Sequence, residues 1–189
     1  MFGGLPKDRL TQDLVNAVDY LNSQSFVRHG KIDSVGFCFG GGLSINLACN
    51  AQTAACVIFY GENPSPIELV EKIKCPVLGI YGGEDERINA TLDRLVAVMT
   101  RYKKDFEMRV YPGAPHAFFN DTNPTTYREQ AAKKLGQSPK VLCPHTPNRL
   151  DQLRMRQQTP RLSPFPAVIL MLQRDVTENN RGNVVGEVV

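Results

Sequence analysis

Hydrophobic residues recur in two alternating patterns along residues 1–136. Short segments rich in apolar residues, typical of strands in a covered sheet, occupy residues 31–37, 54–60, 77–81 and 106–111. Segments with helical spacing or helix-start signals lie before, between and after them, at residues 8–27, 41–50, 65–73, 89–102 and 125–135. We expect Gly30 to end the first of these helices. Strict alternation of short strands with helices predicts an α/β fold with a parallel sheet covered by helices on both faces.

This pattern is lost after about residue 137. Prolines and arginines are scattered through residues 137–189, where only residues 165–172 are apolar enough to be structured. We therefore divide the chain into a partial α/β domain at residues 1–136 and an irregular, poorly ordered tail at residues 137–189. The net charge of +3 comes from the tail, because residues 1–137 hold 15 Lys and Arg against 15 Asp and Glu. Because residues 1–137 carry no net charge, they give no indication of nucleic-acid binding.

The five cysteines are odd in number and lack paired spacing such as C-x-x-C. This usage favours reduced thiols over a disulfide framework or a zinc site. Cys49, Cys56 and Cys75 lie in apolar stretches and are predicted to be core residues. The first ten residues lack the features of a signal peptide, and no apolar run approaches the roughly 18 residues that a membrane helix needs. We therefore expect a cytoplasmic protein without membrane association.

Cys38 stands in the middle of a glycine-flanked turn, at residues 36–41 (GFCFGG), directly after the first apolar run. Such a turn between a strand and a helix lifts a nucleophile above a parallel sheet, and its flanking residues are small because bulk would clash with the sharply turned backbone. The sequence therefore predicts a cysteine nucleophile at the carboxyl end of this strand.

Two further residues follow later strands. Asp85 lies in the loop after residues 77–81, and His116 lies after residues 106–111. Nucleophile, acid and histidine in this order match the catalytic triad of α/β-hydrolases. In such a triad His116 takes the proton of Cys38 and later protonates the leaving oxygen, while Asp85 holds the productive tautomer of the imidazole. The backbone N–H of Phe39 is placed to donate to an oxyanion.

These residues also allow other interpretations. Each one alone suits a structural role: a packed cysteine, a turn aspartate and a surface histidine. A dinucleotide site would need a glycine where Cys38 stands and an acidic residue at a later strand end, and both are missing. A redox role for Cys38 would need a resolving cysteine, for which only Cys49 or Cys56 could approach in space.

Residues 30–122 resemble the dienelactone hydrolase family, α/β-hydrolases that use cysteine as their nucleophile. The segments that carry the resemblance are residues 35–41 (VGFCFGG), 59–61 (FYG), 75–88 (CPVLGIYGGEDERI) and 111–120 (YPGAPHAFFN). The resemblance implies hydrolysis of an enol lactone or similar small-molecule ester through a thioester on Cys38, with no metal or organic cofactor. It also implies that Tyr60 lies near the substrate and that Phe118 helps to wall the substrate pocket.

The chain departs from the family in several places. The strands that precede the nucleophile strand in the family, with their second oxyanion donor, regulatory acid and substrate arginine, have no counterpart here. A second family arginine, four residues past the histidine, is replaced by Asn120. We therefore expect an N-terminally truncated sheet whose exposed edge favours self-association. The alternative to a hydrolase is a catalytically impaired fragment that acts only as a binding or assembly module.

Overall fold

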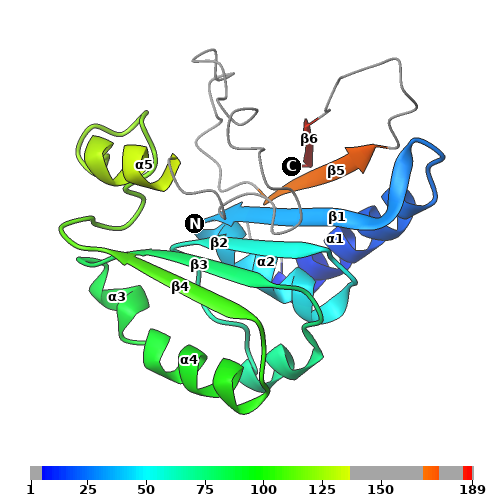
Figure 1. The fold of residues 1–189 in the computed structure, drawn as a ribbon, viewed down its shortest axis with the longest axis horizontal. Helices are drawn as coiled ribbons and strands as arrows, with labels where there is room; N and C mark the ends of the chain where they lie inside the picture. The colour runs from blue at the N-terminus through cyan, green and yellow to red at the C-terminus, as the bar shows by residue number, and fades with distance from the viewer. Residues whose placement is uncertain (1–5, 137–167, 175–184, 189) are drawn as a thin grey trace.

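A mixed sheet forms the centre of the fold (Figure 1). The computed structural model describes residues 6–136, 168–174 and 185–188. In these residues the sheet has six strands, in the order β4-β3-β2-β1-β5-β6. The strands are β1 (Val27–Phe37), β2 (Ala55–Phe59), β3 (Val77–Gly82), β4 (Phe106–Tyr111), β5 (Val168–Arg174) and β6 (Val185–Val188). β1 to β4 are parallel neighbours, which confirms the parallel sheet predicted from the alternating pattern.

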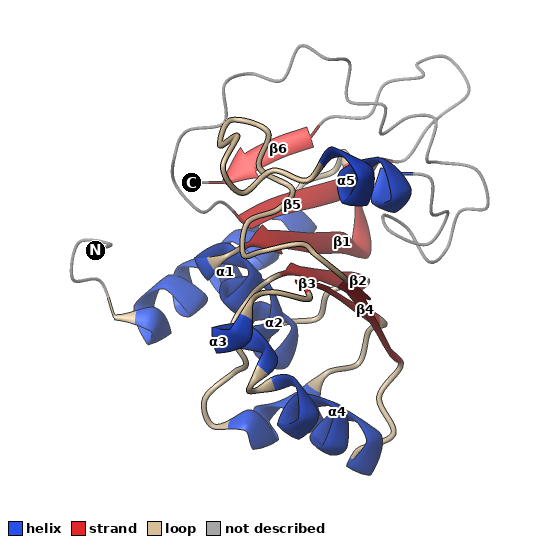
Figure 2. Ribbon diagram, turned by 90° about the vertical axis from the view of Figure 1, so that its left-hand side faces the viewer, coloured by secondary structure: helices blue, strands red, loops and turns tan. Residues whose placement is uncertain are grey.

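Helices cover both faces of this sheet, as expected (Figure 2). They are α1 (Lys7–Asn22), α2 (Phe39–Asn50), α3 (Glu86–Asn89), α4 (Leu92–Arg101) and α5 (Glu129–Gly136), with a 3-10 helix η1 at Ile67–Lys72. Side chains of α1, α2, η1 and α4 pack on one face, and α5 packs on the other. In the described part of the chain, no helix is both long enough and apolar enough to cross a membrane.

The alternation of side chains along β2 shows how the two faces are filled. Cys56 and Ile58 pack with α2 and α4, whereas Val57 and Phe59 pack on the face that carries α5. Successive side chains of a strand point to opposite faces, and both faces of a parallel sheet are covered. Every residue of β2 is therefore buried, which explains why its sequence is an uninterrupted apolar run.

Gly30 does not end the first helix, so that prediction is wrong. α1 already ends at Asn22, and Gly30 lies inside β1 with a φ of +70°. The pairing register of β1 with β5 shifts between Val27 and Ile32, so the glycine sits in an irregular part of the strand. The Asn22 side-chain oxygen accepts a hydrogen bond from the Gly30 backbone N–H at 2.9 Å. A positive φ is readily adopted by glycine at a bulge as well as at a helix end, and the local pattern does not distinguish them.

A strand from the tail pairs with the edge of β1 that was expected to be exposed. β5 pairs antiparallel with β1, from Val168 opposite Gly36 to Arg174 opposite Val27, and β6 pairs with β5. β5 overlaps residues 165–172, the apolar segment noted in the tail, whereas β6 was not predicted. The expectation of an exposed edge at β1 is therefore wrong. The tail residues 137–167, 175–184 and 189 lie outside the described residues.

Candidate active site

Cys38 occupies a sharp turn between β1 and α2. Its φ of 53° and ψ of −117° lie in a region that residues other than glycine rarely adopt. Backbone hydrogen bonds hold the turn: the Cys38 N–H donates to the Phe59 carbonyl at 3.0 Å, and the Cys38 carbonyl accepts from the N–H groups of Gly41 at 3.0 Å and Gly42 at 3.3 Å. The thiol is partly exposed at the carboxyl end of the parallel strands. This is the elbow that the glycine-flanked sequence predicts.

Glycines permit this turn because backbone segments meet closely around it. A Cβ atom at Gly36 would lie 1.9 Å from the Gly40 carbonyl oxygen. A Cβ atom at Gly61 would lie 2.4 Å from the Gly41 carbonyl carbon, where the loop after β2 crosses the first turn of α2. Both distances are far below any real carbon contact, so neither position has room for a side chain. Close backbone packing therefore requires glycine at both positions.

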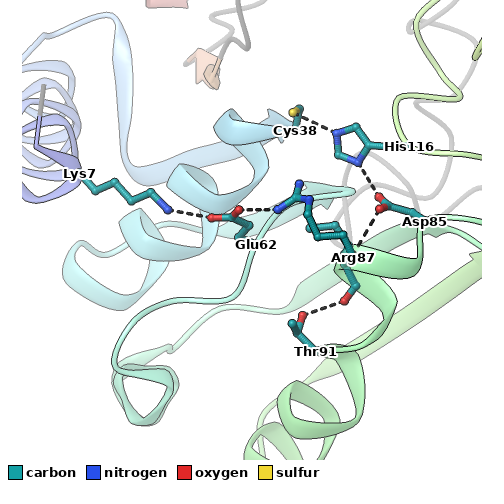
Figure 3. Close-up of polar contacts among 8 residues, drawn as sticks. Lys7, Cys38, Glu62, Asp85, Arg87, Thr91 and His116 are labelled. Carbon is teal, nitrogen blue, oxygen red and sulfur yellow. Dashed lines mark hydrogen bonds and ion pairs between the residues drawn. The ribbon is translucent and has the colours of Figure 1, made fainter. Parts of the chain in front are cut away.

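Asp85 and His116 meet Cys38 at the same edge of the sheet (Figure 3). Asp85 follows β3, and His116 lies in the loop after β4. His116 Nε2 lies 3.1 Å from Cys38 Sγ, and His116 Nδ1 lies 2.5 Å from Asp85 Oδ2. The three groups form one continuous chain of polar contacts, although 78 positions separate Cys38 from His116. The structure thus brings together all three residues that the strand-end argument selected.

Asp85 also has the structural role that its position suggested. It precedes α3, and its Oδ1 accepts a hydrogen bond from the Ile88 backbone N–H at 3.4 Å. Its other carboxylate oxygen contacts His116, and the residue is only 6% exposed. A helix cap and an imidazole partner therefore share one carboxylate. The cap fixes the orientation in which the second oxygen faces the histidine.

The contact between thiol and imidazole changes the acidity of both groups. The His116 hydrogen bond lowers the pKa of Cys38 against the opposing effect of burial, and the Phe39 backbone N–H and the Arg87 charge act in the same direction as His116. The pKa of His116 is raised, chiefly by its hydrogen bond to Cys38 and further by Asp85. A lowered pKa of the thiol and a raised pKa of the imidazole both favour a thiolate–imidazolium pair.

Tyr60 and Phe118, both expected near the substrate, lie in one aromatic group beside the histidine. The ring centroid of Tyr60 is 5.1 Å from that of His116 and 5.8 Å from that of Phe118. Burial and the nearby Cys38 thiolate raise the pKa of Tyr60. Phe118 is fully buried and packs against Tyr111 as well. Phe118 thus packs against Tyr60, and contact of either ring with substrate stays a prediction.

The remaining described cysteines lie apart from this site. Cys49, Cys56 and Cys75 pack on the opposite face of the sheet from Cys38 and its neighbours, as core residues. Burial raises the pKa of Cys49 and of Cys56 to about 12 and raises that of Cys75. A redox partnership between Cys38 and Cys49 or Cys56 therefore has no geometric support. In the residues that the structure describes, no three His, Cys, Asp or Glu side chains gather as metal ligands.

Three charged residues next to the site were not singled out from the sequence. Glu62 forms ion pairs with Lys7 and with Arg87, and all three are drawn in Figure 3. Two of them follow strands at the site edge: Glu62 comes after β2, and Arg87 is two residues beyond Asp85. Their positions at strand ends were the signal that could have identified them. Of the other histidines, His29 is exposed in β1, away from the elbow, and His145 lies outside the described residues.

A cysteine elbow after β1, an aspartate after β3 and a histidine after β4 are the arrangement of a protein with the α/β-hydrolase fold. Comparison with known proteins narrows this class to one family. The model of the dienelactone hydrolase family matches residues 3–140, so this chain belongs to the dienelactone hydrolase family.

Individual relatives agree with this assignment. A protein of Saccharolobus solfataricus, provisionally named a carboxymethylenebutenolidase, is 44% identical over 127 residues, which are 67% of this chain and 48% of the relative. A similarly named protein of Methylorubrum extorquens is 31% identical over 140 residues, with 68% and 48% covered. A crystal structure from Klebsiella pneumoniae, provisionally named a dienelactone hydrolase, has a TM-score of 0.63 at 26% identity and covers 69% of this chain and 58% of that one. The chain spans about half the length of the first two relatives.

Proposed function

We propose that this chain is a cysteine-dependent hydrolase of a lactone or carboxylic ester. The observation that carries the proposal is the unbroken line of contacts from the Cys38 thiol through the His116 imidazole to the Asp85 carboxylate. Membership of the dienelactone hydrolase family supports the choice of substrate, a small ester or lactone. Nucleophile, base and orienting acid all come from the chain, so the reaction needs neither a metal nor an organic cofactor.

Acylation begins with proton transfer from the Cys38 thiol to His116 Nε2. The thiolate attacks the carbonyl carbon, and the carbonyl oxygen becomes an oxyanion that accepts a hydrogen bond from the Phe39 backbone N–H. When the tetrahedral intermediate collapses, the bond to the alkoxide oxygen breaks and His116 returns its proton to that oxygen. A thioester on Cys38 results. For a lactone substrate the released hydroxyl stays attached to the acyl group.

Deacylation uses the same groups in reverse. His116 takes a proton from a water molecule, the resulting hydroxide attacks the thioester carbonyl, and the Cys38 sulfur leaves as a thiolate that is reprotonated from His116. The products are a carboxylic acid and the regenerated thiol. Asp85 accepts the Nδ1–H hydrogen bond throughout, which keeps Nε2 facing the sulfur and stabilises the imidazolium. The short contact of His116 with the buried Asp85 supports this role.

Hydrolysis of a p-nitrophenyl ester and of a dienelactone by the full chain tests the proposal. We expect Cys38→Ala to abolish turnover and Cys49→Ala, a change at a buried thiol of the other face, to retain it. Mass spectrometry of the quenched reaction should show an acyl adduct on Cys38. Unchanged hydrolysis by Cys38→Ala would contradict the proposal. A folded wild-type chain with neither turnover nor adduct would favour the alternative, a binding or assembly module without chemistry.

A further inference from the structure

A charged group centred on Glu62 lies next to the proposed nucleophile and has no part in the mechanism above. Glu62 Oε2 contacts Lys7 Nζ at 2.8 Å, and Glu62 Oε1 contacts Arg87 Nη1 at 2.6 Å. The two cations come from segments 55 positions before and 25 positions after the glutamate. One carboxylate thus joins α1, the loop after β2 and α3 (Figure 3).

Each member of this group contacts or adjoins a segment that carries a site residue. The Lys7 ammonium lies 5.9 Å from the ring centroid of Phe39, the residue after Cys38. The backbone of Glu62 runs against the first turn of α2, since a Cβ atom at Gly42 would lie 3.4 Å from its carbonyl oxygen. Arg87 follows Asp85 by two residues in α3. The group therefore connects the elbow to the aspartate loop from outside.

We propose that Glu62 holds the Arg87 guanidinium at a place from which its positive charge stabilises the Cys38 thiolate. Arg87 supports the reaction through Cys38 and makes no bond to substrate in this account, and Glu62 is the residue that positions Arg87. The inference rests on the proposed function, because it assigns a role in maintaining the thiolate nucleophile.

The charges around Cys38 set the direction of this effect. Among the described side chains, the titratable and charged groups that act on or respond to the thiol are His116, Arg87 and Tyr60. Asp85 contacts His116, and Glu62 forms ion pairs with both Arg87 and Lys7. The imidazole hydrogen bond is the largest cause of the lowered pKa of Cys38, and the Arg87 charge adds to it. Glu62 is itself held as a carboxylate, since Lys7 and then Arg87 lower its pKa.

The test is the pH dependence of Cys38 alkylation by iodoacetamide in the full chain, followed by mass spectrometry. We expect Arg87→Gln to raise the midpoint by about 0.3 to 0.5 pH unit, because Arg87 is largely exposed and its charge is the weakest of the effects that lower the pKa of Cys38. Below both midpoints, that shift is a roughly 2- to 3-fold slower reaction. The matched control is Arg94→Gln, because Arg94 is a similarly exposed arginine, paired with Glu68 at 3.7 Å, and should leave the midpoint unchanged. Added salt should shrink the difference between wild type and Arg87→Gln, because Arg87 is 62% exposed.

The variant Glu62→Gln tests whether Glu62 acts by positioning Arg87 or only through its own negative charge. If Glu62 anchors the Arg87 guanidinium, Glu62→Gln should raise the midpoint of Cys38 alkylation. The rise should be smaller than that in Arg87→Gln. A lowered midpoint in Glu62→Gln would mean that the carboxylate acts only as a negative charge, and it would overturn the positioning role. Equal midpoints for Arg87→Gln, Arg94→Gln and wild type would overturn the role of Arg87. The proposed function fails separately, if wild-type Cys38 reacts like an ordinary thiol or if Cys38→Ala still hydrolyses esters.

Discussion

At the scale of single residues, the proposed chemistry depends on how one imidazole is shared between a thiol and a carboxylate. His116 presents Nε2 to Cys38 and Nδ1 to Asp85, so the carboxylate fixes which nitrogen can accept the thiol proton. The positions of Cys38 and Asp85 on either side of the ring therefore determine the role of each ring nitrogen. A neutral partner at position 85 would no longer stabilise the imidazolium.

The substitution Asp85→Asn tests this role without removing the helix cap. An asparagine oxygen can still accept the Ile88 N–H, so we expect a melting temperature close to that of wild type. Ester turnover should fall by roughly 10²- to 10⁴-fold, because an amide favours the wrong tautomer of the histidine. Turnover and thermal unfolding of the same preparation supply the measurement. Full activity in Asp85→Asn would remove the aspartate from the mechanism.

The sequence predicts that Cys38, Asp85 and His116 lie together, but it does not predict their charged neighbours. Cys38, Asp85 and His116 each follow a strand, and the carboxyl ends of parallel strands meet at one edge, so their proximity could be predicted. The ion pairs of Glu62 join side chains 55 and 25 positions apart. Which surface charges pair depends on how α1 and α3 are packed, and no local pattern contains that information.

At the scale of elements, the join between β1 and α2 is the most constrained part of the fold. Gly36 in the strand and Gly40 in the helix approach so closely that even a methyl group has no place between them. Backbone, not a flexible side chain, lies opposite, so the clash cannot be relieved by a rotamer change. The position of Cys38 therefore depends on the absence of a side chain at residue 36.

Alanine substitutions in this join should have opposite effects. Gly36→Ala should lower the free energy of unfolding by at least about 1 to 3 kcal/mol, because the backbone must shift. A Cβ atom at Gly42, in α2, would lie 3.4 Å from its nearest atom, the Glu62 carbonyl oxygen, which is an ordinary contact. The better helix propensity of alanine should therefore leave the stability of Gly42→Ala unchanged or raise it by up to about 1 kcal/mol. Urea unfolding of both variants provides the comparison. Equal stability of the two would show that the close approach at Gly36 is not present in solution.

The elements themselves were largely predictable, because period and apolar content are local properties. β2, β3 and β4 lie within a residue or so of the predicted strands. The helix predicted at residues 89–102 begins only at Leu92, since a separate short helix, α3, ends at Asn89. β5 could not be placed, because an apolar run does not say which strand it will pair with or in which direction.

At the scale of the whole molecule, β5 changes the expectation for self-association. The family match ends at residue 140, yet a strand from beyond it pairs along β1. An unpaired edge at β1 would present free backbone N–H and C=O groups to other chains. Pairing with β5 satisfies these groups within one molecule.

Truncation tests the role of this strand. A chain that ends after residue 140 exposes the edge of β1, and we expect it to form oligomers that grow with concentration. The full chain, which keeps β5 paired with β1 and β6 paired with β5, should show no such growth. Size-exclusion chromatography with light scattering distinguishes them. If the shorter chain is monomeric at every concentration, β5 does not protect an otherwise adhesive edge.

The most direct test of the central claim is site-resolved alkylation of the native chain across pH, repeated in urea. The lowered pKa of Cys38 means that its thiolate persists below the pH at which ordinary thiols protonate, and the reaction slows only as the pH falls through that lowered value. Cys49, Cys56 and Cys75 should stay protected until the chain unfolds, since burial raises their pKa values. We predict fast alkylation of Cys38 near neutral pH, lost in urea and in His116→Ala. A Cys38 that titrates alike in native wild type, in His116→Ala and in urea would contradict an assembled nucleophile.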